Sequence, residues 1–392
     1  MSKFKYKIFI GIIILFCIVS GIYIYKTHYS PEKVEKSTEI SLWYVKSNEL
    51  YSGFADIADT YNKLESEERQ DVSVKVKAFD SFAKLKAALE KAHSGAGPDM
   101  IACDANNAAI LRKESYTISL SGYFDEWNSN GANKDFLKCA TLGNALVGLP
   151  YAATVEVLIA NTDFVNDADS AENFEQLCAN ANDYYKNSNA PMLAISDYAK
   201  FFKTAMAQLD EDFAAISPRD TESENCKYIY KLLAQTAFDR GISSSYDPID
   251  DVIDGTIPCA IVSSSEVMER AEDMGSSIKI YPCPAMKDGE KIYVPDVETV
   301  CICKTDTNSQ NASAEFLKWF ISDEINCDFV SGSGYIPVSD TLKSTSSNYP
   351  VYKSLKTTIG DVKLEAQAPN LAYVKNYEEF VYIMELVMES LS

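Results

Sequence analysis

Histidine is nearly absent from this chain: the 392 residues include only His28 and His93. Histidine is the usual general base for serine and cysteine nucleophiles, and it is a common zinc ligand. A catalytic arrangement of that kind would have to use His93, because His28 lies in a polar stretch near the N-terminus. Catalysis by a pair of carboxylates, as in glycoside hydrolases, needs no histidine, but nothing in the sequence singles out such a pair. We therefore predict no enzyme, no catalytic residue, no metal site and no cofactor.

Basic residues are also few, with 36 Lys and Arg against 57 Asp and Glu and a net charge of −21. Nucleic-acid binding requires clusters of basic side chains that neutralise phosphates, and no run of Lys or Arg here is dense enough. The sequence also contains no phosphate-binding loop of the nucleotide-hydrolase type. These absences predict a soluble acidic surface with no nucleic-acid partner.

Cysteine is present ten times, but its placement does not suggest a disulfide framework. A chain of this length can fold without covalent links, and most of the cysteines lie within apolar runs. Free cysteine in such a run acts as a small core residue. We predict mostly free, buried thiols. Cys301 and Cys303 would share one strand face, where a soft metal ion is the alternative to core packing.

Residues 8–25 form the only long apolar run, preceded by Lys3, Lys5 and Lys7. Eighteen helical residues span roughly 27 Å, enough to cross the hydrocarbon core of a bilayer. The lysines predict that the remaining chain lies outside the cell. We interpret residues 1–30 as a membrane anchor or signal segment and 31–38 as a tether. Cleavage as a signal peptide and lipidation at Cys17 are the alternatives, and both also imply export.

After residue 38 the sequence alternates between strand and helix patterns. Strands are expected over 40–45, 72–76 and 100–103, and helices over 54–64 and 82–92, the second capped by Asp80. This order predicts parallel strands joined by right-handed crossovers.

The second half continues as an α/β pattern. A long strand is expected over 148–161, followed by a helix-rich stretch from about 172 to 245. Further elements are expected as strands over 257–263 and 297–303 and as helices over 265–273, 312–322 and 377–391. The length favours more than one domain.

Six short segments, in this order, resemble the extracellular solute-binding proteins of ABC importers, the family that includes maltose-binding protein. They are 40–44 (ISLWY), 97–101 (GPDMI), 148–161 (GLPYAATVEVLIAN), 255–261 (GTIPCAI), 314–324 (AEFLKWFISDE) and 332–342 (GSGYIPVSDTL). They resemble, respectively, the first strand, the third strand, the hinge strand, the return strand, a helix and a loop near the C-terminus of that family.

The resemblance implies a two-lobe α/β fold of the periplasmic-binding-protein type (type II), with a hinge between lobes that close over a small solute. We expect the first lobe to contain 39–153 and 258–302, and the second 154–257 and 303–392. The chain is expected to act as a monomer.

Several residues near the expected cleft are candidate ligand contacts. Trp43 and Tyr44 end the first strand and offer aromatic faces to a sugar ring, and Asn48 follows on the adjoining loop. Asp104 lies at the carboxyl end of the third strand, where open α/β sheets place their sites, and it could also cap the next helix. Its carboxylate could accept hydrogen bonds from a pair of hydroxyl groups on a ligand.

Other candidates follow from the resemblance. Tyr151 is favoured as a ligand contact, whereas Glu156 is either a contact or an ordinary strand residue. Ser264 and Ser265 are either contacts or helix caps, at a position where sugar-binding relatives often carry tryptophan. Serine there leaves room for a smaller or more polar ligand. In the second lobe the candidates are Tyr335 and Tyr373.

Together these observations favour a receptor on the extracellular face of the membrane. It would capture a small solute, with a carbohydrate favoured, and deliver it to the permease subunits of an ABC importer. A surface sensor without transport and a secreted carbohydrate-active enzyme are the alternatives.

Overall fold

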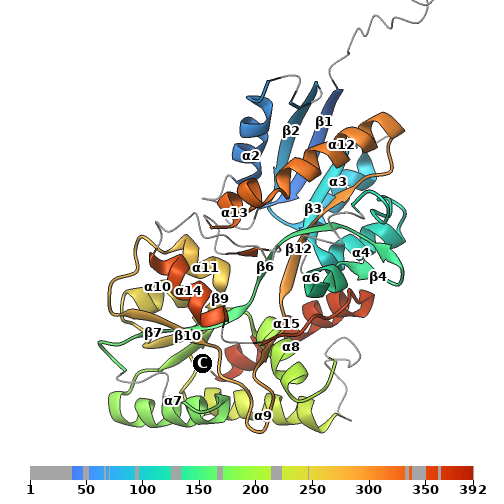
Figure 1. The fold of residues 1–392 in the computed structure, drawn as a ribbon. Helices are drawn as coiled ribbons and strands as arrows, with labels where there is room; N and C mark the ends of the chain where they lie inside the picture. Colours follow the sequence, from blue (N-terminus) through green and yellow to red (C-terminus); the bar gives the residue numbers. More distant parts are fainter. Residues whose placement is uncertain are drawn as a thin grey trace, which may run out of the picture.

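The computed structural model describes residues 38–46, 53–65, 68–69, 71–92, 97–124, 134–165, 171–212, 223–245, 247–331, 335–337, 350–360 and 363–391. These residues form two α/β lobes, each built on its own sheet (Figure 1). The predicted N-terminal anchor lies outside the described residues. Within them, no helix is both long enough and apolar enough to cross a membrane.

The first lobe contains a six-stranded sheet in the order β13-β6-β12-β3-β1-β2. As predicted, β1 pairs in parallel with both β2 and β3, whereas β12 is antiparallel to β3 and β6. The carboxyl ends of β1 and β3 therefore lie at one edge of the sheet. The strands are β1 (Thr38–Val45), β2 (Val72–Phe79), β3 (Met100–Asp104), β6 (Leu149–Thr154), β12 (Asp296–Ile302) and β13 (Ile336–Pro337).

Helices cover this sheet because their apolar stripes pack on it. Phe316 and Phe320 of α12 are fully buried in the same cluster as Ile40 and Leu42 of β1. Burying each such side chain contributes about 1.5–3 kcal/mol. The helices of this lobe are α2 (Gly53–Asn62), α3 (Phe82–Lys91), α4 (Ala105–Lys113), α6 (Lys134–Cys139), α12 (Thr307–Phe320) and α13 (Asp323–Ser331). A hairpin of β4 (Thr141–Leu142) and β5 (Ala145–Leu146) follows α6.

The cap of α3 differs from the prediction. Ser81, not Asp80, is the N-cap residue, and its hydroxyl accepts a hydrogen bond from the Lys84 backbone N–H. Ser81 is the extended residue directly before the helix, and that position brings a side-chain oxygen to the first free N–H groups. Asp80 instead forms an ion pair with the Lys84 ammonium.

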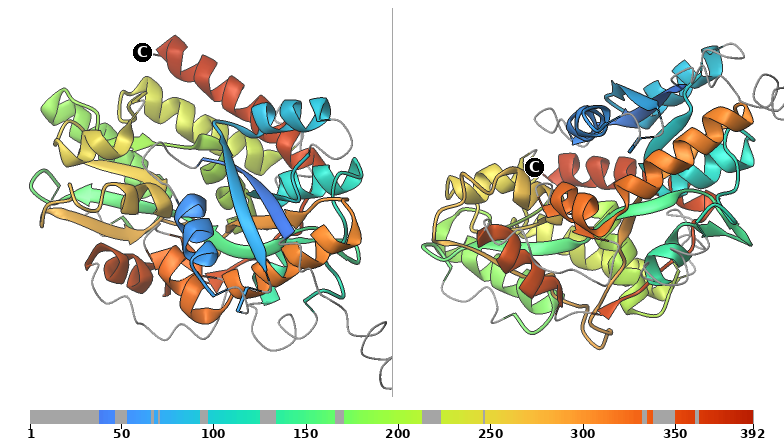
Figure 2. Two further views of the ribbon diagram at one scale, coloured as in Figure 1. Left: turned by 90° about the horizontal axis from the view of Figure 1, so that it is seen from above. Right: turned by 45° about the horizontal axis from the view of Figure 1, so that its top comes forward.

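The second lobe contains a four-stranded sheet in the order β10-β7-β9-β8. Its strands are β7 (Glu156–Asn161), β8 (Leu193–Ile195), β9 (Cys259–Ser263) and β10 (Ile278–Pro282). Its helices are α7 (Phe174–Ser188), α8 (Tyr198–Gln208), α9 (Glu224–Phe238), α10 (Pro248–Ile253), α11 (Ser264–Glu269) and α14 (Pro350–Gly360). The sheet lies among these helices, as the two views of Figure 2 show.

The chain crosses between the lobes at several places. The predicted long strand over 148–161 is two strands, β6 and β7, which separate at Val155 and join different sheets. A second crossing leads from β10 to β12 through β11 (Ile292–Tyr293), which pairs with β14 (Lys363–Leu364). The last helix, α15 (Leu371–Leu391), contacts α4 of the first lobe and α8 and α9 of the second.

Two predicted lobe boundaries are wrong. Residues 258–302 were expected in the first lobe, but β9 and β10 pair with β7 in the second. Residues from 303 onward were expected in the second lobe, but α12 packs on β1 of the first. Strands such as β9 and β12 are both largely buried apolar runs, so either sheet could accept them. The choice depends on pairing partners far away in the chain.

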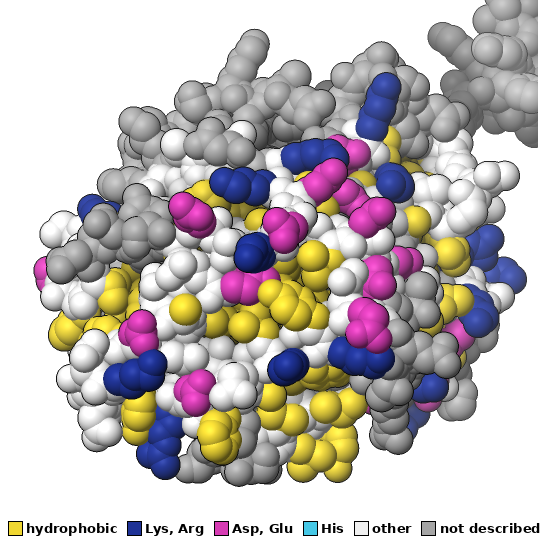
Figure 3. Space-filling view, turned by 90° about the horizontal axis from the view of Figure 1, so that it is seen from below, with side chains coloured by type: hydrophobic (Ala, Val, Ile, Leu, Met, Phe, Trp, Pro, Cys, Tyr) yellow, Lys and Arg dark blue, Asp and Glu magenta, His cyan; other side chains and the backbone are white. Residues whose placement is uncertain are grey.

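The prediction of free thiols is confirmed for the cysteines whose side chains the structure describes, which are all free and buried. They are Cys103, Cys139, Cys178, Cys226, Cys259, Cys283, Cys301 and Cys303. Within the described residues no group of metal-ligating side chains could hold an ion. On the face of the second lobe shown in Figure 3, acidic and basic side chains are interspersed among apolar ones.

Candidate functional site

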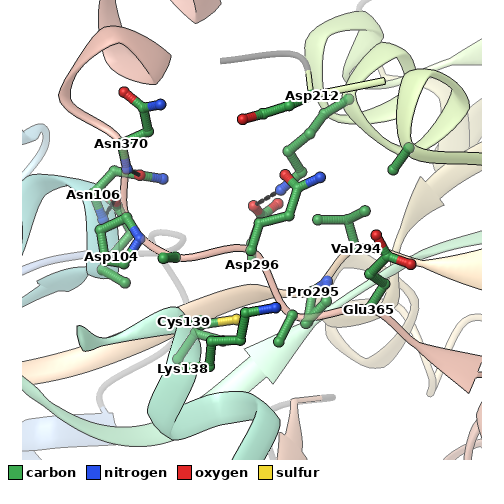
Figure 4. A pocket seen from close by; sticks show the side chains of 18 of the residues that line it. Asp104, Asn106, Lys138, Cys139, Asp212, Val294, Pro295, Asp296, Glu365 and Asn370 are labelled. Atoms are coloured by element: carbon green, nitrogen blue, oxygen red, sulfur yellow. Dashed lines mark hydrogen bonds and ion pairs between the residues drawn. The ribbon is translucent and has the colours of Figure 1, made fainter. Parts of the chain in front are cut away.

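A cavity of about 720 Å³ lies between the lobes. The first lobe contributes the first turn of α4, the end of α6 and the beginning of β12, and the second contributes α8. The segment 365–370 and Tyr377 of α15 complete the wall. Figure 4 shows Asn106 and Asp104 on one side of the space and Asp212 on the other, with Asp296 between them. Charged and amide side chains therefore form part of this wall.

A second cavity of about 230 Å³ adjoins the first and has an aromatic lining. Asp104, Asn107 and Glu298 line both spaces, so the two are neighbours. The other lining residues are Tyr44, Val45, Lys46, Phe54, Phe82, Ala102, Cys103, Tyr151, Phe329 and Tyr335. A ligand that spans both cavities would meet rings at one end and charged or amide groups at the other.

Asp104 caps α4 and faces the cavities at the same time. One carboxylate oxygen accepts the backbone N–H groups of Asn106 and Asn107, both at 3.0 Å, and the other accepts the Asn107 side-chain amide. Burial raises the pKa of Asp104, while the hydrogen bonds from Asn107 oppose that rise. The two roles predicted for this residue, helix cap and cleft residue, are thus compatible.

A buried ion triad connects α8 with the beginning of β12. The Lys203 ammonium contacts the Asp296 carboxylate, and Lys200 Nζ lies 3.6 Å from the other Asp296 oxygen. Side-chain exposure is 5% for Lys203 and 18% for Asp296, so water screens this pair weakly. Burial raises the pKa of Asp296, but the two ammonium groups outweigh that effect and the pKa is lowered. Asp296 is therefore ionised.

Two glutamates near this triad have unusual pKa values. Glu156 begins β7 and Glu298 lies in β12. Burial raises the pKa of each to about 8. Lys200 opposes the rise at both positions, whereas Asp104 adds to it at Glu298. One Glu156 carboxyl oxygen is buried with no hydrogen-bond partner in the described part of the chain. Both carboxyl groups hold a proton at neutral pH.

These two glutamates are expected to make the stability of the empty protein fall as the pH rises. The folded state keeps each proton up to about pH 8, whereas unfolded glutamate releases it near pH 4.3. The unfolded state thus binds fewer protons between these values, and each glutamate lowers stability by up to about 1.4 kcal/mol per pH unit. Urea unfolding at about pH 6 and pH 7 should show that loss.

The variant Glu156→Gln should show a smaller loss between these pH values, because one of the two contributions is gone. The matched control is Glu224→Gln, since Glu224 is 85% exposed and pairs with its helix neighbour Lys227. It should retain the wild-type slope. An unchanged slope in Glu156→Gln would contradict the assignment.

The structure gathers some of the predicted contacts at the cavities and leaves others elsewhere. Tyr44, Tyr151, Tyr335 and Asp104 all line the smaller cavity. Trp43 lines neither, because successive strand residues point to opposite sheet faces. Its ring lies 5.1 Å from that of Phe79, in the cluster that contains Leu85 and Ile101.

Glu156, Ser264 and Ser265 do not line these cavities. Glu156 is buried, with an exposure of 4%. Ser264 is fully buried, and its hydroxyl accepts the Val155 N–H at 3.3 Å. The Ser265 hydroxyl lies 3.1 Å from that of Ser263. Asn48 and the side chain of Tyr373 lie outside the described residues.

Sequence analysis missed the charged residues that α8 and β12 bring to the larger cavity. Lys200 and Lys203 lie in a helix-rich stretch with no recognisable motif. Asp296 and Glu298 did offer a signal, because the two acids flank Val297 at the start of a strand that is otherwise buried. An acidic residue on a buried strand face is rare unless it is paired or functional.

Comparison with known proteins settles the family. The profile of the bacterial extracellular solute-binding protein family matches residues 56–355. The chain belongs to this family. The predicted two-lobe fold of these solute-binding proteins is confirmed.

Several solved structures have a similar fold. The cyclic alpha-maltosyl-1,6-maltose binding protein from Arthrobacter globiformis is 16% identical, with 90% of this chain and 98% of that one covered and a TM-score of 0.69. The maltose-bound MalE3 of T. maritima is 11% identical, with 90% and 99% covered and a TM-score of 0.69. A chitin oligosaccharide binding protein is 15% identical, with 90% and 94% covered and a TM-score of 0.72. No curated protein matches the sequence.

Proposed function

We propose that this solute-binding protein captures a carbohydrate between its lobes and delivers it to the permease of an ABC importer. The observation that carries the proposal is the pair of adjoining cavities at the lobe junction. Because groups from both lobes line the larger one, a ligand that contacts both sides favours the closed form. Recognition is expected to be non-covalent, without catalysis.

The chemistry of the two linings suits a sugar. Sugar rings have apolar C–H faces, which stack on aromatic side chains, and hydroxyl edges, which need hydrogen-bond partners. The smaller cavity offers the rings of Tyr44, Tyr151 and Tyr335, and the larger offers amides such as Asn106 and Asn370. The three solved relatives described above are named for maltose, a cyclic maltosyl-maltose and chitin oligosaccharide, which supports the same ligand class.

The site residues that we propose are those that face the cavities: Tyr44, Asp104, Tyr151 and Tyr335. The family description supports an extracellular location. We propose that the segment over 8–25 exports the chain and holds it at the membrane, either as a retained helix or through Cys17.

A thermal-shift screen of sugars, amino acids, polyamines and anions is expected to give its largest shifts with sugars. Binding to the folded state alone stabilises by about 2.7 kcal/mol when the ligand is at a hundredfold excess over Kd. The result that would contradict the proposal is stabilisation by amino acids or anions with no response to any sugar.

The same sugar can then test the site. Asp104→Asn keeps an N-cap side chain for α4 but removes the carboxylate from both cavities, so affinity should fall about tenfold, a loss of about 1.4 kcal/mol. The matched control is Asp306→Asn, because Asp306 caps α12 in the same way and lines neither cavity. Titration calorimetry should give an unchanged Kd for the control. Equal affinities for both variants would exclude Asp104 from the site.

A further inference from the structure

Glu298 lines both cavities and therefore lies at their junction. It projects from the same strand as Asp296, two residues away, but its surroundings differ. The Asp296 carboxylate contacts two lysine ammonium groups. In the described part of the chain, no hydrogen bond or ion pair engages the Glu298 side chain. A carboxyl group placed in a binding space without a protein partner is available to a ligand.

The charged neighbours of Glu298 do not supply a cation for it. They are Asp104, Lys200 and Asp296. The oxygens of Asp104 are directed to the first turn of α4, and Lys200 is directed to Asp296. Lys46 also lines the smaller cavity, but it is exposed and lies close enough to Asp80 to lower the pKa of that residue. Glu298 therefore lies near two acids, Asp104 and Asp296, and the ammonium that acts on it, Lys200, is paired with Asp296.

The rest of the lining of both cavities also favours a positively charged ligand. The larger cavity is lined by Asp210, Glu211, Asp212 and Glu365 in addition to the acids near its centre, and these acids outnumber its lysines, which are Lys138, Lys200 and Lys203. The rings of the smaller cavity lie next to the junction, and the negative face of an aromatic ring attracts cations. A neutral ligand would use the hydroxyl-binding groups, but it would not neutralise the negative charge of these acids.

We infer that the carbohydrate bound by this protein is an amino sugar, whose protonated amine lies at the junction between Glu298 and Asp104. The ammonium group supplies the counter-charge that the protein lacks, and a charge-assisted hydrogen bond forms when Glu298 ionises. Burial together with the Asp104 charge raises the pKa of the empty Glu298 to about 8, so binding near neutral pH releases a proton. This inference rests on the proposed carbohydrate function and names the sugar class.

The test compares two disaccharides that differ in charge: β-1,4-linked glucosamine disaccharide and its N-acetylated, neutral counterpart. Titration calorimetry of the full chain near neutral pH should give at least a tenfold lower Kd for the amine. Glu298→Gln, which has the same shape without the charge, should reduce that preference to less than about threefold. Glu298→Asp keeps the charge and should retain most of the preference for the amine. The matched control Glu315→Gln changes an acid of α12 that lines neither cavity, and it should retain the full preference.

Proton release provides a second readout. The measured enthalpy of amine binding should depend on the ionisation enthalpy of the buffer in wild type and should lose most of that dependence in Glu298→Gln. Thermal midpoints of all variants without ligand show whether each is folded. Putrescine, an amine without a sugar, tests the source of the amine, and it should bind at least tenfold more weakly than the glucosamine disaccharide.

The outcomes separate this inference from the proposed function. Equal or tighter binding of the neutral disaccharide, or a preference for the amine that survives in Glu298→Gln, would overturn the inference while sugar binding stands. Putrescine binding as tightly as the disaccharide would overturn the assignment to a sugar. Failure of every sugar in the thermal screen would overturn the proposed function itself.

Discussion

Replacement of Asp296 with alanine is expected to lower the free energy of unfolding by about 3–5 kcal/mol, because it removes a carboxylate that neutralises a buried ammonium. The carboxylate neutralises Lys203, whose side chain is 5% exposed, and Lys200 lies 3.6 Å from its second oxygen. Without it, both ammonium groups lose this counter-charge beside the larger cavity. The loss should appear in urea unfolding of the ligand-free protein.

The control for this prediction is an ion pair of similar geometry in a different environment. Asp183 and Lys186 lie 2.7 Å apart on α7, but their side chains are 71% and 70% exposed. Asp183→Ala should therefore cost no more than about 1 kcal/mol. A double variant, Asp296→Ala with Lys203→Met, should lose less than the sum of the two single variants because the groups interact directly. Additive losses, or a loss no greater than in the control, would show that burial of the triad contributes little.

Phe320→Ala is the second substitution with a large expected effect, again about 3–5 kcal/mol. The Phe320 side chain is fully buried, and its ring centroid lies 5.4 Å from that of Tyr151 and 5.2 Å from that of Phe329. Both neighbours form the aromatic wall of the smaller cavity. Truncation would leave a void behind this wall, so ligand affinity should decrease together with stability.

Phe238 provides the matched control, because it is the same residue type at 68% exposure at the end of α9. Phe238→Ala should change the free energy of unfolding by less than about 0.5 kcal/mol. Urea unfolding followed by intrinsic fluorescence suits the comparison, since Trp43 and Trp319 both lie in the first lobe. A small loss for Phe320→Ala would mean that its neighbours collapse into the space.

Local patterns in the sequence were sufficient for most of the first lobe. The alternating valines of β2 and the apolar stripe of α2 identify each element because their periods are 2 and 3.6 residues. The same reasoning identified Asp104 as both a cap and a cleft residue, since it directly follows a buried strand. The exact cap of α3 was misassigned by one residue.

The larger part of the candidate site could not be predicted in this way. Lys200 and Asp296 are nearly a hundred residues apart, and nothing local to either indicates that they meet. Trp43 and Tyr44 are equally plausible ligand contacts in the sequence, but β1 directs them to opposite faces of its sheet. The lobe membership of β9 was also misassigned, because a short buried strand carries no mark of the sheet that it will join.

The amino-acid order by itself determined the class of protein, through the strand and helix periods and the ordered segments shared with solute-binding proteins. It also determined that acidic groups would dominate, because composition does not depend on folding. The tertiary structure alone decided which acids face the space between the lobes and which of them have a cation. The reason is that pairing and burial arise from contacts between distant segments, whereas periodicity and capping arise from neighbours along the chain.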